Sequence, residues 1–170
     1  MLEPDATIAW HPSTRGIAHV GITVPDLDDA TNFFQRAFGA TVLADIIKAE
    51  DPDLEMRDVT GTDFAAALGV DATTSMHAVR MLLLHDGARI ELFQYAKSSP
   101  RPPVICSDYG LQHIAVLVED IASATESVIA AGGTAFPGPY PAPLGSPDAL
   151  FRYCLAPWGS AVELIYDPAP

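Results

Sequence analysis

Two stretches of the chain decide its fold: GIAHVGITVPDL at residues 16–27 and GLQHIAVLVEDI at residues 110–121. Each is an apolar run with one histidine near its centre, followed by a pattern that starts a helix. Apolar side chains then recur at helical spacing over 27–38 in the first copy and about 121–131 in the second, and glycine follows both helices. Each stretch therefore predicts a buried strand that leads into a helix.

The two copies also close alike, with RIELFQY at residues 89–95 and SAVELIY at residues 160–166. A repeat of a whole supersecondary unit is a stronger fold signal than any single propensity. The fold class is therefore α+β, with two βαβββ modules. The predicted strands cover 17–24, 41–47, 78–84 and 89–95 in the first copy, and 111–118, 134–136, 149–155 and 160–166 in the second.

Composition shifts along the chain predict its domain boundaries. Residues 1–15 form an N-terminal arm, 16–96 the first module, 97–109 a linker rich in proline and serine, and 110–167 the second module. The first module carries an insertion at 48–76, of a length that often forms a lid or a binding loop. A further loop, rich in glycine and proline, is expected over 137–147.

Bulk composition excludes several classes of function. With 49% hydrophobic and 18% charged residues the chain is globular, and its net charge of −13 argues against nucleic acid and anionic membranes as partners. The acidic start at Met1 lacks the features of a secretory signal, and no apolar stretch reaches membrane-spanning length, so we expect a cytoplasmic protein. Cys106 and Cys154 form no metal or redox spacing and are expected to be free thiols.

Four polar residues lie at matching places in the two copies: His19 and His113 on the first strands, and Glu91 and Glu163 on the last. Buried polar side chains need partners, and taken singly each histidine is better explained as a satisfied core residue. Their joint placement indicates a shared metal ion, and His with carboxylate suits Fe, Mn, Co, Ni or Zn. A site with three ligands is the alternative, and in that site Glu91 would be the residue that does not bind the metal. The remaining histidines are expected on the surface or in loops: His11, His77 and His85.

The strand–helix openings, the two-copy layout and the closing APWGSAVELI at residues 156–165 resemble the vicinal oxygen chelate superfamily. This superfamily includes glyoxalase I, methylmalonyl-CoA epimerase, extradiol dioxygenases and the fosfomycin- and bleomycin-resistance proteins. The resemblance covers about residues 16–167. It implies that the modules curl into an open mixed sheet, whose concave cleft holds one divalent metal, and that the helices lie on the convex side.

Ligand identity narrows what the resemblance implies. The set His19, Glu91, His113 and Glu163 is similar to that of glyoxalase I, whereas the methylmalonyl-CoA epimerases usually have Gln where Glu91 stands. The first helix lacks the arginine, and the strand ending at Tyr95 lacks the asparagine, with which glyoxalases bind glutathione. We therefore expect a metal-dependent isomerase or epimerase, or a glyoxalase-like lyase, that abstracts a proton next to a carbonyl.

The substrate of such an enzyme is a small molecule with two adjacent oxygens that chelate the metal. A carboxylate takes the proton from the carbon between them. Glu163 is the first choice for this catalytic base and Glu91 the second, because a ligand that leaves the metal can carry the proton in glyoxalase-like sites.

Two other classes stay open at this point. An extradiol-type ring-cleaving dioxygenase would use the same histidines and glutamates with ferrous iron, and needs a further His or Tyr on the concave face. A drug-binding resistance protein needs no metal, and proteins of that kind usually lack the ligands. In this superfamily modules often pair across chains, so we also expect a homodimer.

Overall fold

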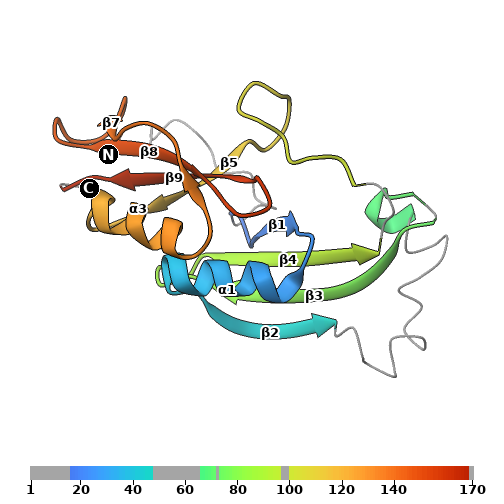
Figure 1. The fold of residues 1–170 in the computed structure, drawn as a ribbon. Coiled ribbons are helices and arrows are strands. Elements are labelled where there is room, and N and C mark those ends of the chain that lie inside the picture. Colours follow the sequence, from blue (N-terminus) through green and yellow to red (C-terminus); the bar gives the residue numbers. More distant parts are fainter. Residues whose placement is uncertain (1–15, 48–65, 72, 97–99, 169–170) are drawn as a thin grey trace, which may run out of the picture.

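The computed structural model describes residues 16–47, 66–71, 73–96 and 100–168. The N-terminal arm and most of the insertion predicted at 48–76 lie outside these ranges. The described chain forms two sheets, each with one long helix (Figure 1). Neither of these helices is long and apolar enough to cross a membrane.

The first module contains β1 (Val20–Thr23), α1 (Leu27–Phe38), β2 (Thr41–Ile47), β3 (Ser75–Leu83) and β4 (Arg89–Ala96). Its sheet has the order β1-β4-β3-β2. The first strand, β1, pairs in parallel with the last strand, β4, and the remaining pairs are antiparallel. One side of β1 therefore pairs with β4, and the other side pairs with no described strand.

The second module contains β5 (His113–Leu117), α3 (Ile121–Ala130), β6 (Thr134–Ala135), β7 (Tyr140–Pro141), β8 (Leu150–Leu155) and β9 (Ala161–Tyr166). Its sheet has the order β5-β9-β8-β6, and β5 again pairs in parallel with the last strand. Apart from β7, this order repeats that of the first module. The predicted α+β fold with two βαβββ modules is confirmed; the residue boundaries proposed for the modules stay a prediction.

Three details of the strands differ from the prediction. The strand predicted at 78–84 begins at Ser75, inside the segment predicted as an insertion at 48–76. The opening strands are shorter, because pairing begins at Val20 and His113, and the apolar residues Ile17 and Leu111 before them are exposed. The predicted loop at 137–147 contains the short strand β7, which pairs with β8. Pro141 is tolerated in β7 because β7 is an edge strand. The outer side of an edge strand has no neighbouring strand, so a missing N–H there breaks no hydrogen bond of the sheet.

Local sequence explains where both helices begin. The side chains of Asp26 and Asp120 accept hydrogen bonds from the backbone N–H groups of Asp29 and Ser123, three residues later. Hydrogen bonds from the side chain and then the backbone N–H of Ser123 hold the pKa of the Asp120 carboxyl below its usual range. The first helix ends at Gly39, whose φ of 64° is the left-handed conformation that favours glycine.

The two modules share one hydrophobic core. Helix α1 packs on β3 and β4 and contacts α3, which packs on β8 and β9 (Figure 1). The core cluster includes Phe33 and Leu92 from the first module and Val128 and Leu164 from the second. Trp158, in the turn between β8 and β9, places its ring 5.4 Å from that of Phe33. The last turn of the second module is thus fixed to the first helix.

Replacing Phe33 by Ala should lower the free energy of unfolding by about 3–5 kcal/mol, the usual range for deleting a buried aromatic ring. Phe33 is 1% exposed, and its ring contacts Phe34, Phe38 and Trp158. Leu144→Ala is the control: this side chain is 77% exposed, and its loss should cost no more than about 0.5 kcal/mol. Urea unfolding followed by circular dichroism measures both, and equal losses would contradict the shared core.

Candidate metal centre

Strand alternation separates the four predicted ligands from the core. Ile90 and Leu92 on β4 are buried in the core, so Glu91 between them points to the opposite face of the sheet. In β9 the buried residues Val162 and Leu164 flank Glu163 in the same way. Both glutamates therefore lie on the face of their sheet that the helices do not cover.

Each histidine contacts the glutamate of its own module. Nε2 of His19 lies 3.1 Å from Oε2 of Glu91, and Nε2 of His113 lies 3.2 Å from Oε2 of Glu163. The side chains of the glutamates are 15% and 14% exposed, and those of the histidines 43% and 27%. The structure thus forms two similar His–Glu pairs, which are open to solvent on the histidine side.

The register of the strands explains why the pairs are equivalent. Glu91 lies opposite Gly21, two residues after His19. Glu163 lies opposite Ala115, two residues after His113. In both modules the residue opposite the glutamate is small, so the glutamate can meet the histidine two positions earlier diagonally across the parallel ladder.

The geometry of each pair fits two neighbouring ligands of a divalent metal. His nitrogen and carboxylate oxygen bind such ions at about 2.1 Å, so two ligand atoms at a right angle stand about 3.0 Å apart. The observed separations of 3.1 and 3.2 Å are close to this value. The donors are also of the type that Fe, Mn, Co, Ni and Zn accept.

The two pairs do not form one cluster within a single chain. Among the described residues, no three His, Cys, Asp or Glu side chains are placed so that they could hold a metal ion together. Each module therefore contributes two donors of the predicted four. Ile17, two residues before His19, and Leu117, on β5 with His113, are exposed apolar side chains, and β1 and β5 each have one side without a described strand partner.

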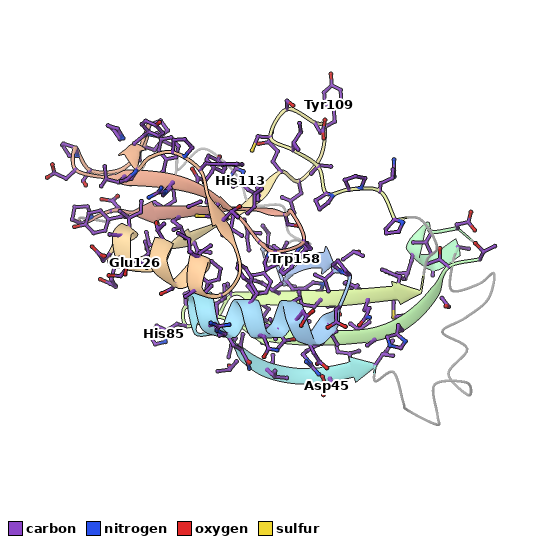
Figure 2. All side chains as sticks on the ribbon, viewed as in Figure 1. Asp45, His85, Tyr109, His113, Glu126 and Trp158 are labelled. Atoms are coloured by element: carbon purple, nitrogen blue, oxygen red, sulfur yellow. The ribbon has the colours of Figure 1, made fainter. Side chains whose placement is uncertain are left out.

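The other candidate residues lie apart from the pairs. His85 is exposed in the turn between β3 and β4 (Figure 2). His77 is exposed on β3, and His11 is outside the described residues. Cys106 is exposed and Cys154 is buried in β8, and both are free thiols as expected. Burial raises the pKa of the Cys154 thiol, which keeps it neutral near pH 7.

Sequence reasoning missed two tyrosines next to the pairs. Tyr95 shares the face of Glu91 on β4, and its ring stacks on Phe93. Tyr153 on β8 lies opposite Glu163 in the antiparallel ladder, and its ring packs edge-on against His113. Burial, and then the nearby glutamate, raise the pKa of each phenol, so both stay protonated near pH 7.

A signal for Tyr153 is present in the sequence. Positions 153 and 163 are equally far from Trp158, the centre of the turn between β8 and β9. A tight antiparallel hairpin places such residues opposite each other. In the first module, Met81 and Glu91 are likewise equally far from Asp86, and they lie opposite each other in the hairpin of β3 and β4.

A cavity of about 280 Å³ lies between the modules, near His113. Gly21–Thr23 of β1 line one side, and Leu111–Ile114, before and at the start of β5, line another. Phe34, Arg101 and Trp158 are among the other lining residues. The cavity therefore lies between β1 of the first module and the start of the second. Arg101, Gln112 and His113 give it polar groups that could bind the oxygens of a small molecule.

Comparisons with known proteins agree on the family. The profile of the Glyoxalase/Bleomycin resistance protein/Dioxygenase superfamily matches residues 16–164. A 2-epi-5-epi-valiolone epimerase from an Actinomyces species is 34% identical over 161 residues, which are 93% of this chain and 82% of that protein.

Solved structures show the same fold. A glyoxalase family protein from Bacillus cereus aligns with a TM-score of 0.69 at 16% identity, over 92% of this chain and 97% of that one. The fosfomycin resistance protein FosX from Listeria monocytogenes, solved with Mn(II) and sulfate, aligns with a TM-score of 0.54 at 17% identity, over 90% and 93% of the two chains.

Replacing His113 by Ala should weaken Zn²⁺ binding at least about 100-fold, since it deletes a donor outright, whereas losing an outer-shell partner usually costs 10–100-fold. Competition with a chromogenic chelator measures the dissociation constant. His85→Ala is the matched control, because His85 is an exposed histidine in a turn. Equal losses in the two variants would place the metal elsewhere.

Proposed function

Because the chain belongs to the Glyoxalase/Bleomycin resistance protein/Dioxygenase superfamily, we propose that it is a metal-dependent epimerase. Its substrate in this proposal is a small hydroxylated ketone of the valiolone type, and the reaction inverts a hydroxyl-bearing carbon next to the carbonyl. The identity to a 2-epi-5-epi-valiolone epimerase supports the reaction class. The observation that carries the proposal is the pair of equivalent His–Glu contacts at ligand spacing.

In the proposed site, His19, Glu91, His113 and Glu163 hold one divalent cation. Such a cation, when bound, polarises the carbonyl and a neighbouring oxygen of the substrate, which makes the hydrogen on the carbon between them acidic. The cavity beside His113 provides room for a small molecule, and the polar groups of Arg101 and Gln112 can hydrogen-bond its hydroxyls.

Glu163 is the proposed base, with Glu91 as the second choice. Its carboxylate is mostly buried and lies 3.2 Å from the His113 imidazole. Inversion requires that a proton leave one side of the carbon and return on the other. With one carboxylate from each module, the site has a group on each side that can accept or return it.

Assembly is part of the proposal. The four donors come from two modules that do not bring them together within one chain, so we propose that each site takes His19 and Glu91 from one protomer and His113 and Glu163 from the other protomer of a homodimer. The exposed apolar side chains of Ile17, two residues before His19, and Leu117, on the strand of His113, support this, because a dimer interface there would bury them. Single chains would then hold metal weakly.

Replacing Glu163 by Gln should preserve the fold, because the side chain is nearly isosteric, and should slow proton exchange by about 10²–10⁴-fold. The measurement is solvent-deuterium incorporation into 2-epi-5-epi-valiolone, with metal content determined on the same samples. Glu119→Gln is the matched control, because Glu119 is an exposed glutamate just after β5. Full exchange by the Glu163 variant would remove it as the base.

Mixing two inactive variants tests the assembly. If sites form across chains, a heterodimer of His19→Ala and His113→Ala protomers combines both substitutions in one site and leaves the other site intact. Random re-annealing makes about half of the dimers heterodimers, each with one intact site, so the mixed protein should recover about one high-affinity metal site per four chains. If sites form within chains, every site keeps one substitution and no affinity returns. Light scattering on the same samples should show a dimer.

A ring-cleaving dioxygenase is the second candidate, and one observation favours it. Tyr153 lies against His113 on the face away from the helices, where a dioxygenase needs an additional His or Tyr. Oxygen uptake with a panel of catechols and added ferrous iron separates the two functions, because an epimerase consumes no oxygen.

A further inference from the structure

The two half-sites differ in how their histidines are held. In metal sites the ring nitrogen that does not bind the metal usually hydrogen-bonds to a carboxylate, a carbonyl or water, which fixes the ring. In His113, Nε2 contacts Glu163, while Nδ1 is buried and has no hydrogen-bond partner among the described residues. Among the described residues, no hydrogen bond to Nδ1 therefore helps Glu163 to hold the orientation of this imidazole.

Tyr153 is placed to do this. Its ring centroid is 5.2 Å from that of His113 and the two planes meet at 88°, an edge-to-face contact. Tyr153 is held in turn by Phe151, whose ring is 6.0 Å away at 83°, and Phe151 contacts Tyr140 of β7. Three aromatic rings on β7 and β8 thus form a row that ends on His113.

The first module provides an internal comparison. The residue opposite Glu91 in the ladder is Met81, which occupies the position that Tyr153 has opposite Glu163. No aromatic ring of the described residues stacks on His19, whose side chain is 43% exposed against 27% for His113. The register is the same in both modules, so the position opposite the glutamate is equivalent and differs in its side chain.

We propose that Tyr153 is a positioning residue whose ring fixes the His113 imidazole, so that the second half-site is already ordered before metal binds. The proposal rests on the proposed metal site. In it the ring, and not the hydroxyl, is the part of Tyr153 that acts. The His19–Glu91 half has no equivalent support and becomes ordered only when the metal and the second half-site are in place.

Three variants test this: Tyr153→Phe keeps the ring, Tyr153→Leu removes it, and Met81→Leu is the matched control in the first module. The dissociation constant for Zn²⁺ should stay within about threefold for the Phe and control variants, and rise about 10–100-fold for the Leu variant, the usual loss for an outer-shell partner. Circular dichroism confirms that each variant is folded before it is measured.

NMR relaxation measures the order of the His113 ring in metal-free protein, so this second test does not depend on metal binding. Ring order should be high in wild type and Tyr153→Phe, and low in Tyr153→Leu. Unchanged affinity and ring order in the Leu variant would overturn the proposal, and an equal loss in the Phe variant would transfer the role to the hydroxyl. If wild type bound no Zn²⁺, the metal site would be wrong, while ring order would still decide the role of Tyr153.

Discussion

The parallel pairing of the first and last strand of each module is the constraint on which the rest of the structure depends. It places a histidine from one end of the module beside a glutamate about fifty to seventy residues later. It also requires a crossover, which the helix provides, and that helix covers one face of the sheet. Alternation along the strand then decides the rest: Leu92 and Leu164 are buried against the helices, and the glutamates next to them point away.

The two faces of the sheets have opposite roles: the face covered by the helices forms the apolar core, and the other face carries the polar pairs. The helix side is apolar and continuous between the modules, through contacts of α1 with α3 and of Trp158 with Phe33. Arg36, near the end of α1, donates a hydrogen bond to the backbone oxygen of Ala130 at the end of α3. The opposite side has polar donors and exposed apolar residues. A polar pair there costs little burial energy, since water or a metal can satisfy it.

The repeated unit is symmetric in its backbone but not in its side chains. Both modules place His and Glu at the same register, yet Met81 and Tyr153 differ at the equivalent position. Both β1 and β5 have one side without a described strand partner, and a cavity lies between β1 and the start of the second module. The backbone repeat therefore places two equivalent His–Glu pairs, and in our proposal the side chains around them decide how firmly each pair is held.

Much of this architecture could be read from the sequence. The helix at 27–38 and the strand at 41–47 have the bounds that apolar spacing, Asp26 and Gly39 indicate, because local signals decide where such elements begin and end. The four candidate donors also follow from the repeat. Even Tyr153 could have been placed, since a tight turn at Trp158 sets the register of the hairpin around it.

The sequence by itself determined the two modules, the order of their elements and the donors that each one carries. Only the tertiary structure decided that each histidine contacts the glutamate of its own module, and that the two pairs remain apart within the chain. The physical reason is that strand pairing within a module follows from local pattern and alternation. The placement of one module on the other depends on how Phe33, Trp158 and the two helices pack, which no repeat or spacing encodes.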